Sequence, residues 1–175
     1  MGRGKAAGIG ILIAAFVAFL DQYVKNLVRE HLAPGESLPA DGGFFSLYHT
    51  NNTGVAFSML REHPNVILWI QAALLALIAV GLGLLLRRGN VPWYYVVSLG
   101  MMLGGGAGNL IDRLARGYVT DFIKVGDSFA IFNLADAALT GGCGLLIIGL
   151  IVAERRRSRE EAGAGEAGSA EAAHE

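Results

Sequence analysis

The chain has 175 residues, of which 53% are hydrophobic and 17% are charged, and its formal net charge is -1. Soluble domains average about 25% charged residues, so this composition comes close to excluding a soluble protein. The absence of a basic surplus also argues against nucleic-acid binding. One cysteine cannot form a disulfide framework or a Cys-rich zinc site, and the four histidines lack the HExxH spacing of zinc proteases. We therefore expect no metal site and no cofactor.

Four apolar segments are long enough to cross a bilayer as helices, for which about 20 apolar residues suffice. In lipid the backbone must bond internally, and the alternating pattern of barrel strands is absent, so we predict helices. The first segment could instead be a cleaved signal peptide, but no Ala-x-Ala site follows it. The predicted spans are residues 9–28, 66–86, 93–111 and 132–152.

Basic residues predict the orientation of these spans. The tight basic clusters all fall on one side of a four-span chain, and the positive-inside rule makes that side cytoplasmic. Both termini are then cytoplasmic, and the connections at about 29–65 and 112–131 face outward. The residues that set this orientation are Arg3, Lys5, Arg87, Arg88, Arg155, Arg156, Arg157 and Arg159.

The two ends of the predicted membrane domain differ in composition. In the longer outer loop, prolines and glycines (Gly42 and Gly43 among them) precede residues 44–48, which predicts turns and then a short strand-like segment. The tail, 158–175, consists almost wholly of Ala, Gly, Glu and Arg and has no large apolar residue, which predicts disorder. The chain is thus predicted to be one integral membrane domain, 1–157, with a disordered cytoplasmic tail.

The first span contains two ionisable residues. Asp21 and Lys25 are four positions apart, so they share a helix face. They form either a self-neutralising pair that snorkels toward the outer interface or a pair that supports a site.

The third span is rich in small residues. Gly104 and Gly108 make a small-xxx-small pair, which favours close packing against another helix. Gly105, Asn109 and Arg113 follow one another at a spacing of four, which indicates a polar seam that faces the bundle interior.

Two aspartates are candidates for acid–base chemistry. Asp121 lies in the second outer loop, and Asp136 lies about one turn inside the fourth span, on the face of Asn133. If the chain returns as a hairpin, both carboxylates meet at the outer surface. One of two adjacent carboxylates tends to keep its proton, so one can act as acid and the other as base. The alternative is a helix cap together with a solvated loop charge.

Four sequence blocks occur in the order typical of one known family. They are DQYVK at 21–25, NTGVAF at 52–57, GGAGNLIDR at 105–113 with GYVTDF at 117–122, and FNLAD at 132–136. Together, on a four-span chain of this length, they resemble the bacterial lipoprotein signal peptidases, also called signal peptidase II. The resemblance covers about residues 9–152.

This resemblance implies an intramembrane aspartic endopeptidase of the bacterial cytoplasmic membrane, with its active site near the outer face. Its substrates would be diacylglyceryl-modified prolipoproteins, cut on the amino side of the lipidated cysteine, and globomycin-type inhibitors would bind the same pocket. The implied fold is membrane all-α, a bundle of four transmembrane helices with a small extracytoplasmic β-sheet, the substrate cradle, in the first outer loop. Membrane lipid is the surrounding partner, and we expect a monomer.

The resemblance also assigns residues. Asp121 and Asp136 match the catalytic pair, and Arg113 is expected near them, where its charge would favour ionisation of one carboxyl. Substrate-binding or site-supporting roles are implied for Asp21, Lys25, Asn52, Gly54, Gly108, Asn109, Arg113, Asn133 and Ala135.

Other functions remain as alternatives. The main one is an ion- or proton-coupled transporter, but transporters place polar groups near the bilayer midplane, and here they cluster toward the outer ends. A non-catalytic assembly protein would explain the glycines but not the paired aspartates. The Gly-x-Gly-Asp tetrapeptide of another intramembrane protease class does not occur.

Overall fold

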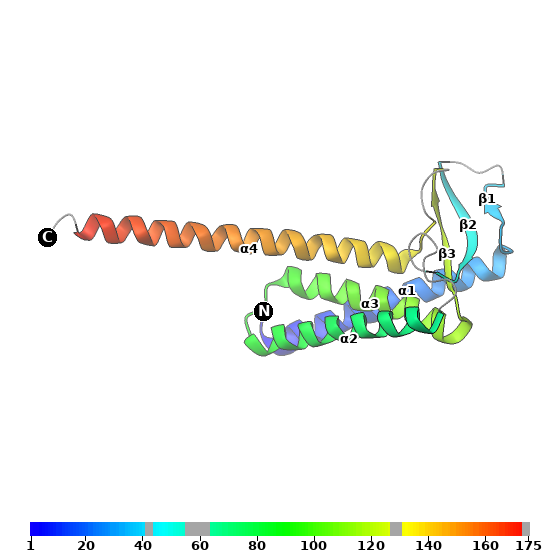
Figure 1. The fold of residues 1–175 in the computed structure, drawn as a ribbon, viewed down its shortest axis with the longest axis horizontal. Helices are drawn as coiled ribbons and strands as arrows, with labels where there is room; N and C mark the ends of the chain where they lie inside the picture. The colour runs from blue at the N-terminus through cyan, green and yellow to red at the C-terminus, as the bar shows by residue number, and fades with distance from the viewer. Residues whose placement is uncertain (41–43, 55–63, 127–130, 173–175) are drawn as a thin grey trace.

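The computed structural model describes residues 1–40, 44–54, 64–126 and 131–172. A bundle of helices carries a small sheet at one end, here called the sheet end, and the chain starts at the opposite, N-terminal end (Figure 1). The helices are α1 (Arg3–His31), α2 (Pro64–Arg88), α3 (Trp93–Arg116) and α4 (Leu134–Ala172), and the strands are β1 (Ser37–Leu38), β2 (Phe45–Asn52) and β3 (Val119–Val125).

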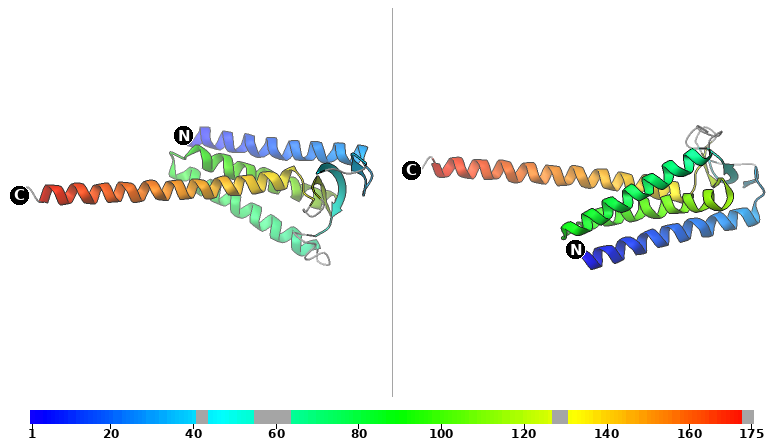
Figure 2. Two further views of the ribbon diagram at one scale, coloured as in Figure 1. Left: turned by 90° about the horizontal axis from the view of Figure 1, so that it is seen from above. Right: turned by 60° about the horizontal axis from the view of Figure 1, so that its bottom comes forward.

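Three of the described helices are long and apolar enough to cross a membrane, namely α1, α2 from residue 65 onward, and residues 134–159 of α4. The remaining helix, α3, is one residue shorter than α2, and its glycines and Asn109 make it less apolar. Both views in Figure 2 show α2 diverging from α1 toward the sheet end. The prediction of a helical membrane protein is confirmed, and the chain is a multi-pass membrane protein.

The first three predicted spans lie inside α1, α2 and α3, whereas α4 differs at both ends from the predicted span 132–152. It begins later, because Phe132 pairs with β3 and Asn133 caps the helix. It also continues to Ala172 and projects beyond the bundle (Figure 1), so the structure is helical where the composition of 158–175 predicts disorder. Alanine and glutamate, which dominate this segment, are strong helix formers.

Glycines let the backbones of α3 and its neighbours approach closely. A Cβ atom on Gly104 would lie 2.6 Å from the carbonyl oxygen of Ala14 in α1, and one on Gly105 would collide with the carbonyl oxygen of Ala135 in α4. A Cβ on Gly108 would meet the Asp21 carboxylate at 2.5 Å. Helices in lipid associate through such close packing. α3 is therefore held between α1 and α4, as the small-residue pattern predicts.

The sheet has the order β1-β2-β3, and both pairs of strands are antiparallel. The strand predicted at 44–48 is confirmed as part of β2, whereas Gly42 and Gly43 lie outside the described residues. The prediction that the sheet belongs to the first outer loop is wrong in one respect, because β3 comes from the connection between α3 and α4. Gly117, in the left-handed conformation (φ 78°), ends α3 and turns the chain into β3. The sheet thus joins the α1–α2 and α3–α4 connections, and this brings Asp121 to the helices.

Candidate active site

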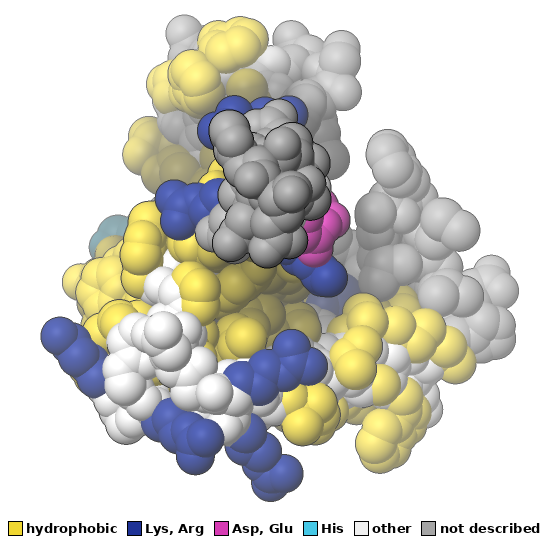
Figure 3. Space-filling model, turned by 90° about the vertical axis from the view of Figure 1, so that its left-hand side faces the viewer, with side chains coloured by type: hydrophobic (Ala, Val, Ile, Leu, Met, Phe, Trp, Pro, Cys, Tyr) yellow, Lys and Arg dark blue, Asp and Glu magenta, His cyan; other side chains and the backbone are white. Residues whose placement is uncertain are grey.

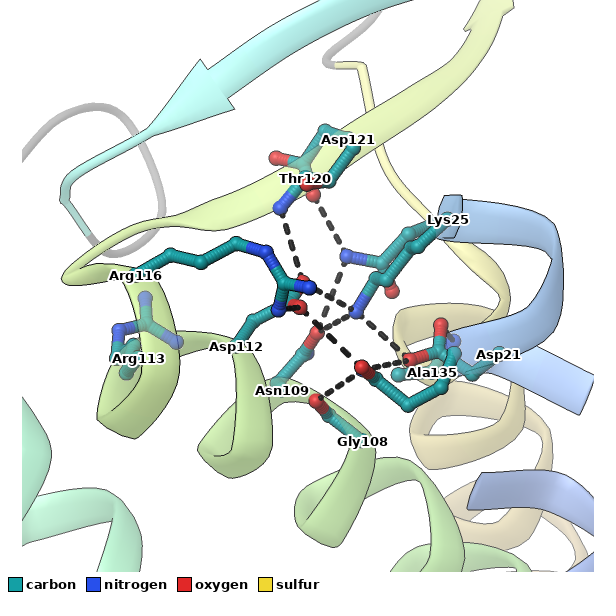
Figure 4. A network of polar contacts seen from close by, with 12 residues as sticks. Asp21, Lys25, Gly108, Asn109, Asp112, Arg113, Arg116, Thr120, Asp121 and Ala135 are labelled. Carbon is teal, nitrogen blue, oxygen red and sulfur yellow. Dashed lines mark hydrogen bonds and ion pairs between the residues drawn. The ribbon is translucent and has the colours of Figure 1, made fainter. Parts of the chain in front are cut away.

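A layer of polar side chains fills the sheet end of the bundle (Figure 4). At its centre Asn133 touches both aspartates that the sequence singles out. Its side-chain Nδ2 donates to Oδ1 of Asp121 at 2.6 Å, and its backbone N–H donates to Oδ2 of Asp136 at 3.3 Å. The N–H of Asp136 donates back to Oδ1 of Asn133 at 2.9 Å, which completes a capping box at the start of α4. The alternative interpretation, a helix cap together with a solvated loop charge, is met only in part, because Asp136 belongs to the cap but Asp121 is buried.

Two further amides complete the bonding of the two carboxylates. Asn52 donates from Nδ2 to Oδ2 of Asp121 at 2.8 Å, and its own Oδ1 is fixed by the N–H of Gly54 at 3.0 Å. Asn109 donates from Nδ2 to Oδ1 of Asp136 at 2.8 Å. Within the described part of the chain, each of the four carboxylate oxygens therefore accepts one N–H.

The environment of Asp121 favours a retained proton. The residue is only 2% exposed, although it lies on a strand outside the membrane-spanning helices. Burial, the largest effect, raises the pKa of Asp121 to about 6 from its ordinary value of 3.8, and the nearby charge of Asp136 acts in the same direction. The amide donors and the positive charge of Lys25 oppose this rise.

Lys25 occupies a buried position between two more carboxylates. Its Nζ lies 2.7 Å from Oδ2 of Asp21 and 3.2 Å from Oδ2 of Asp112, and all three side chains are fully buried. The interpretation of Asp21 and Lys25 as a pair that snorkels to the interface is therefore wrong. Asp21 also accepts the backbone N–H of Ala135 at 3.0 Å, and Gly108 leaves the space that its carboxylate occupies. This pair ties α1 to the start of α4.

Arg113 makes its hydrogen bonds away from the two carboxylates, although its charge acts on both, as expected. Its guanidinium donates to Oε1 of Gln71 in α2 at 3.0 Å and to the carbonyl oxygen of Gly54 after β2 at 2.7 Å. Among the described residues, the contacts of Arg113 thus go to these two groups and not to either carboxylate. Two cations act on Asp121 through their charge, Lys25 and Arg113, and Arg113 also acts on Asp136. The block at 52–57 continues beyond Gly54 into residues outside the described part of the chain.

Sequence reasoning missed part of the polar layer. The most prominent omission is Asp112, which lies three and four positions after Asn109 and Gly108 and so on their helix face. That spacing was sufficient to find it. Arg116 also follows from spacing, because it lies four positions after Asp112 in α3. The remaining members join through tertiary contacts that no spacing reveals; they are Gln22, Arg29, Gln71 and Thr120. Within the described residues, no group of three or more His, Cys, Asp or Glu side chains is arranged to hold a metal ion.

This fold and this site define a membrane-embedded helical protein in which two aspartates at one end bond to the same asparagine. The family model described as signal peptidase (SPase) II matches residues 13–152. A lipoprotein signal peptidase of Dehalococcoides mccartyi is 42% identical over 136 residues, which are 75% of this chain and 82% of that protein. Another, from Xanthomonas campestris pv. campestris, is 38% identical over 161 residues, which are 87% of this chain and 94% of that protein.

Solved structures agree with the sequence comparisons. A structure described as a bacterial membrane enzyme, solved by the in meso method, matches with a TM-score of 0.73 at 31% identity and covers 82% of this chain and 88% of its own. A second structure of the same description matches with a TM-score of 0.71. The chain belongs to the signal peptidase II family, and it is a peptidase. These comparisons favour the peptidase and not the transporter alternative.

Proposed function

We propose that Asp121 and Asp136 are the catalytic pair of an aspartic endopeptidase that removes the signal peptide from lipoprotein precursors. The observation that carries the proposal is the bridge through Asn133, which bonds to both carboxylates and holds them side by side at the sheet end. Two carboxylates held close together by one residue interact through their charges and titrate as a pair, so one of them tends to keep a proton.

The proposed reaction begins with Asp121 protonated and Asp136 ionised. Asp136 takes a proton from a water molecule, whose oxygen attacks the scissile carbonyl carbon, while Asp121 donates its hydrogen bond to the carbonyl oxygen. The tetrahedral intermediate then collapses, the C–N bond breaks, and the leaving amine receives the proton that Asp136 took from water. Asn52, Asn109 and Asn133 keep both carboxylates oriented through these steps.

One face of the sheet is apolar, which is consistent with an apolar substrate. Side chains alternate along a strand, so Ile123 and Val125 share the face of Asp121, and residues opposite each other on neighbouring strands share it too. Leu47 pairs with Ile123, Phe45 with Val125, and Leu38 with Leu47. The apolar sheet face is therefore Leu38, Phe45, Leu47, Ile123 and Val125.

This apolar sheet face is exposed where it leaves the bundle, to 71% at Phe45 and 58% at Leu38. Exposed apolar patches of this kind mark binding surfaces. A diacylglyceryl-modified prolipoprotein reaches such a surface laterally from the lipid and is cut on the amino side of its lipidated cysteine. Globomycin-type inhibitors are proposed to occupy the same site, and the working unit is a monomer in membrane lipid.

We also propose that the sheet end faces outward and that both termini are cytoplasmic. The view of the N-terminal end in Figure 3 shows Lys and Arg side chains around an apolar interior. Basic residues at this end include Arg87 and Arg88 in the last turn of α2. The positive-inside rule places such a basic end in the cytoplasm.

Cleavage by matched variants tests the proposal. Purified wild type, Asp121→Asn and Asp136→Asn are incubated in nanodiscs with a diacylglyceryl-modified prolipoprotein, and the products are sequenced. Glu161→Gln is the control, since Glu161 pairs with Arg157 at the exposed surface of α4. We expect cleavage before the modified cysteine by wild type and control, and none by the two folded aspartate variants. Substantial cleavage by either aspartate variant would overturn the assignment of the pair.

A further inference from the structure

A third buried aspartate lies beneath the proposed catalytic pair. Asp112 is in the last turns of α3 and is 0% exposed. Its Oδ1 lies 3.1 Å from Nη1 of Arg116 and 3.4 Å from Nη1 of Arg29, and its Oδ2 lies 3.2 Å from Nζ of Lys25. Its Oδ2 also accepts the backbone N–H of Thr120 at 3.1 Å. One carboxylate thus contacts α1, α3 and β3, yet it has no place in the proposed chemistry.

The contact with Thr120 fixes the strand beside the catalytic carboxyl. Asp112 holds the N–H of Thr120, and Arg29 donates from Nη1 to Oγ1 of Thr120 at 2.7 Å. Successive side chains of a strand point to opposite faces. Because the side chain of Thr120 is anchored to α1, that of Asp121 must point to the other face, where Asn133 binds it. The distance between the two carboxylates therefore depends on this anchor.

A second path leads from Asp112 to Asp136. Lys25, which Asp112 shares with Asp21, donates from Nζ to Oδ1 of Asn109 at 2.9 Å. With its oxygen thus occupied, Asn109 presents Nδ2 to Oδ1 of Asp136. A change in the position or charge of Lys25 is therefore expected to affect Asp136 through the side-chain amide of Asn109.

We propose that Asp112 is a positioning residue that sets the geometry and the electrostatic potential of the Asp121–Asp136 pair without touching substrate. The inference rests on the proposed function of that pair. Asp112 faces α1 and β3, and the charged groups around it and the pair come from four elements. They are Asp21, Lys25 and Arg29 of α1, Arg113 and Arg116 of α3, Asp121 of β3, and Asp136 of α4.

The charge of Asp112 has a predictable effect on catalysis. Without it, Lys25 keeps only Asp21, and Arg29 and Arg116 lose their shared carboxylate, so the potential at the pair becomes more positive. A more positive potential releases the proton of Asp121 at lower pH. Loss of the partly exposed Arg116 acts in the opposite direction. If Asp112 were only structural, its substitution would lower the amount of folded enzyme but would not move the pH–rate profile of the enzyme that folds.

The test compares Asp112→Asn and Arg116→Gln with wild type and with Glu161→Gln, whose residue belongs to an exposed i,i+4 ion pair. Cleavage of a lipid-modified precursor peptide in detergent gives kcat and KM from pH 5 to 8, per mole of folded enzyme. We expect Asp112→Asn to lower kcat by about 10-fold or more while KM stays within about two-fold. Its alkaline limb should move to lower pH by about half a unit or more, and that of Arg116→Gln to higher pH.

Other outcomes contradict the inference. An unchanged pH profile and an unchanged kcat in Asp112→Asn would make the residue structural, and a rise confined to KM would make it a substrate contact. If Asp112→Asn does not fold, the direction in which the pH profile of Arg116→Gln moves decides the question. A profile of Arg116→Gln that does not move overturns the inference. If Asp121→Asn or Asp136→Asn cleaves, the proposed pair itself is wrong. If both are inert while Asp112→Asn matches wild type, only the present inference fails.

Discussion

The two ends of the helical bundle bury different kinds of side chain. At the N-terminal end a small cluster of Ala6, Val91 and Val96 is buried, with other apolar side chains packed around it. At the sheet end Ile67 and Ala135 are buried, but so are many charged or amide side chains, with Lys25 and Asn133 among the largest. Burial of charge is unfavourable unless each group is paired, whereas burial of valine needs no partner. The sheet end, where we propose the catalytic pair, therefore depends on the pairing of its buried charges, whereas the N-terminal end does not.

Removal of Lys25 should give the largest loss of stability at the sheet end. Lys25→Met keeps the volume but leaves Asp21 and Asp112 buried without their shared cation. Loss of one partner of a buried pair costs about 3–5 kcal/mol, so the free energy of unfolding in detergent should fall by that amount. Arg157→Met, which removes a cation from an exposed ion pair, is the control and should leave the melting temperature nearly unchanged. Equal effects of the two variants would mean that Asp21 and Asp112 do not depend on Lys25 for their burial.

The polar end also shows how far the sequence predicts this protein. The helices, the strand within β2 and the pair Asp21–Lys25 follow from hydropathy, turn residues and i,i+4 spacing. The approach of Asp121 and Asp136 to each other, with Asn133 bonded to both, was predicted only as a possibility, because it depends on how the second loop returns. β3 shows why, since its pairing partner lies in the first loop, about 70 residues away in the chain.

Individual residues of the site show the same limit. Arg113 has the spacing of the polar seam, yet its guanidinium turns to Gln71 and Gly54, because α2 brings an acceptor that no local pattern predicts. Asp112 has that spacing too, but its role depends on Arg29 and Thr120, which reach it from other elements. Sequence periodicity gives the face of a helix, whereas the contacts of that face are determined by packing.

Titration should affect the sheet end and not the N-terminal end. The pKa of Asp121 is about 6 in the folded protein and 3.8 in its ordinary state, so the folded chain holds a proton that the unfolded chain lacks between these values. Its contribution to stability is full below about pH 4 and is lost as the pH rises through 6, by up to about 3 kcal/mol. We therefore expect the melting temperature of wild type to fall relative to that of Asp121→Asn between pH 4 and 7.

That titration experiment has an internal control. Val96→Ala removes two methyl groups from the N-terminal cluster and adds no titrating group, so its melting temperature should run parallel to that of wild type at every pH. A constant difference between wild type and Asp121→Asn over this range would mean that Asp121 does not bind the proton assigned to it.

Close packing at the sheet end gives the next largest effect. Gly105→Ala places a methyl group against the carbonyl oxygen of Ala135, which is backbone, so α3 or the start of α4 must shift. Overpacking of this kind costs about 1–3 kcal/mol, and it moves Asp136 with the helix. The matched control is Gly83→Ala in α2, where nothing lies within 4 Å of the added atom and a small gain in helix stability is expected. Similar melting temperatures for the two variants would contradict the close approach of α3 and α4.

The smallest expected effect separates the two ends directly. Val96→Ala should lower the free energy of unfolding by about 1 kcal/mol, because the cavity lies among apolar side chains that can close on it and no polar group loses a partner. The kcat of precursor cleavage should stay within about two-fold, since no contact in the polar layer involves Val96. A loss of kcat beyond 10-fold in folded Val96→Ala enzyme would show that the helices transmit packing changes along their length. In that case the sheet end depends on the apolar end for its geometry, and the polar network does not by itself fix the distance between Asp121 and Asp136.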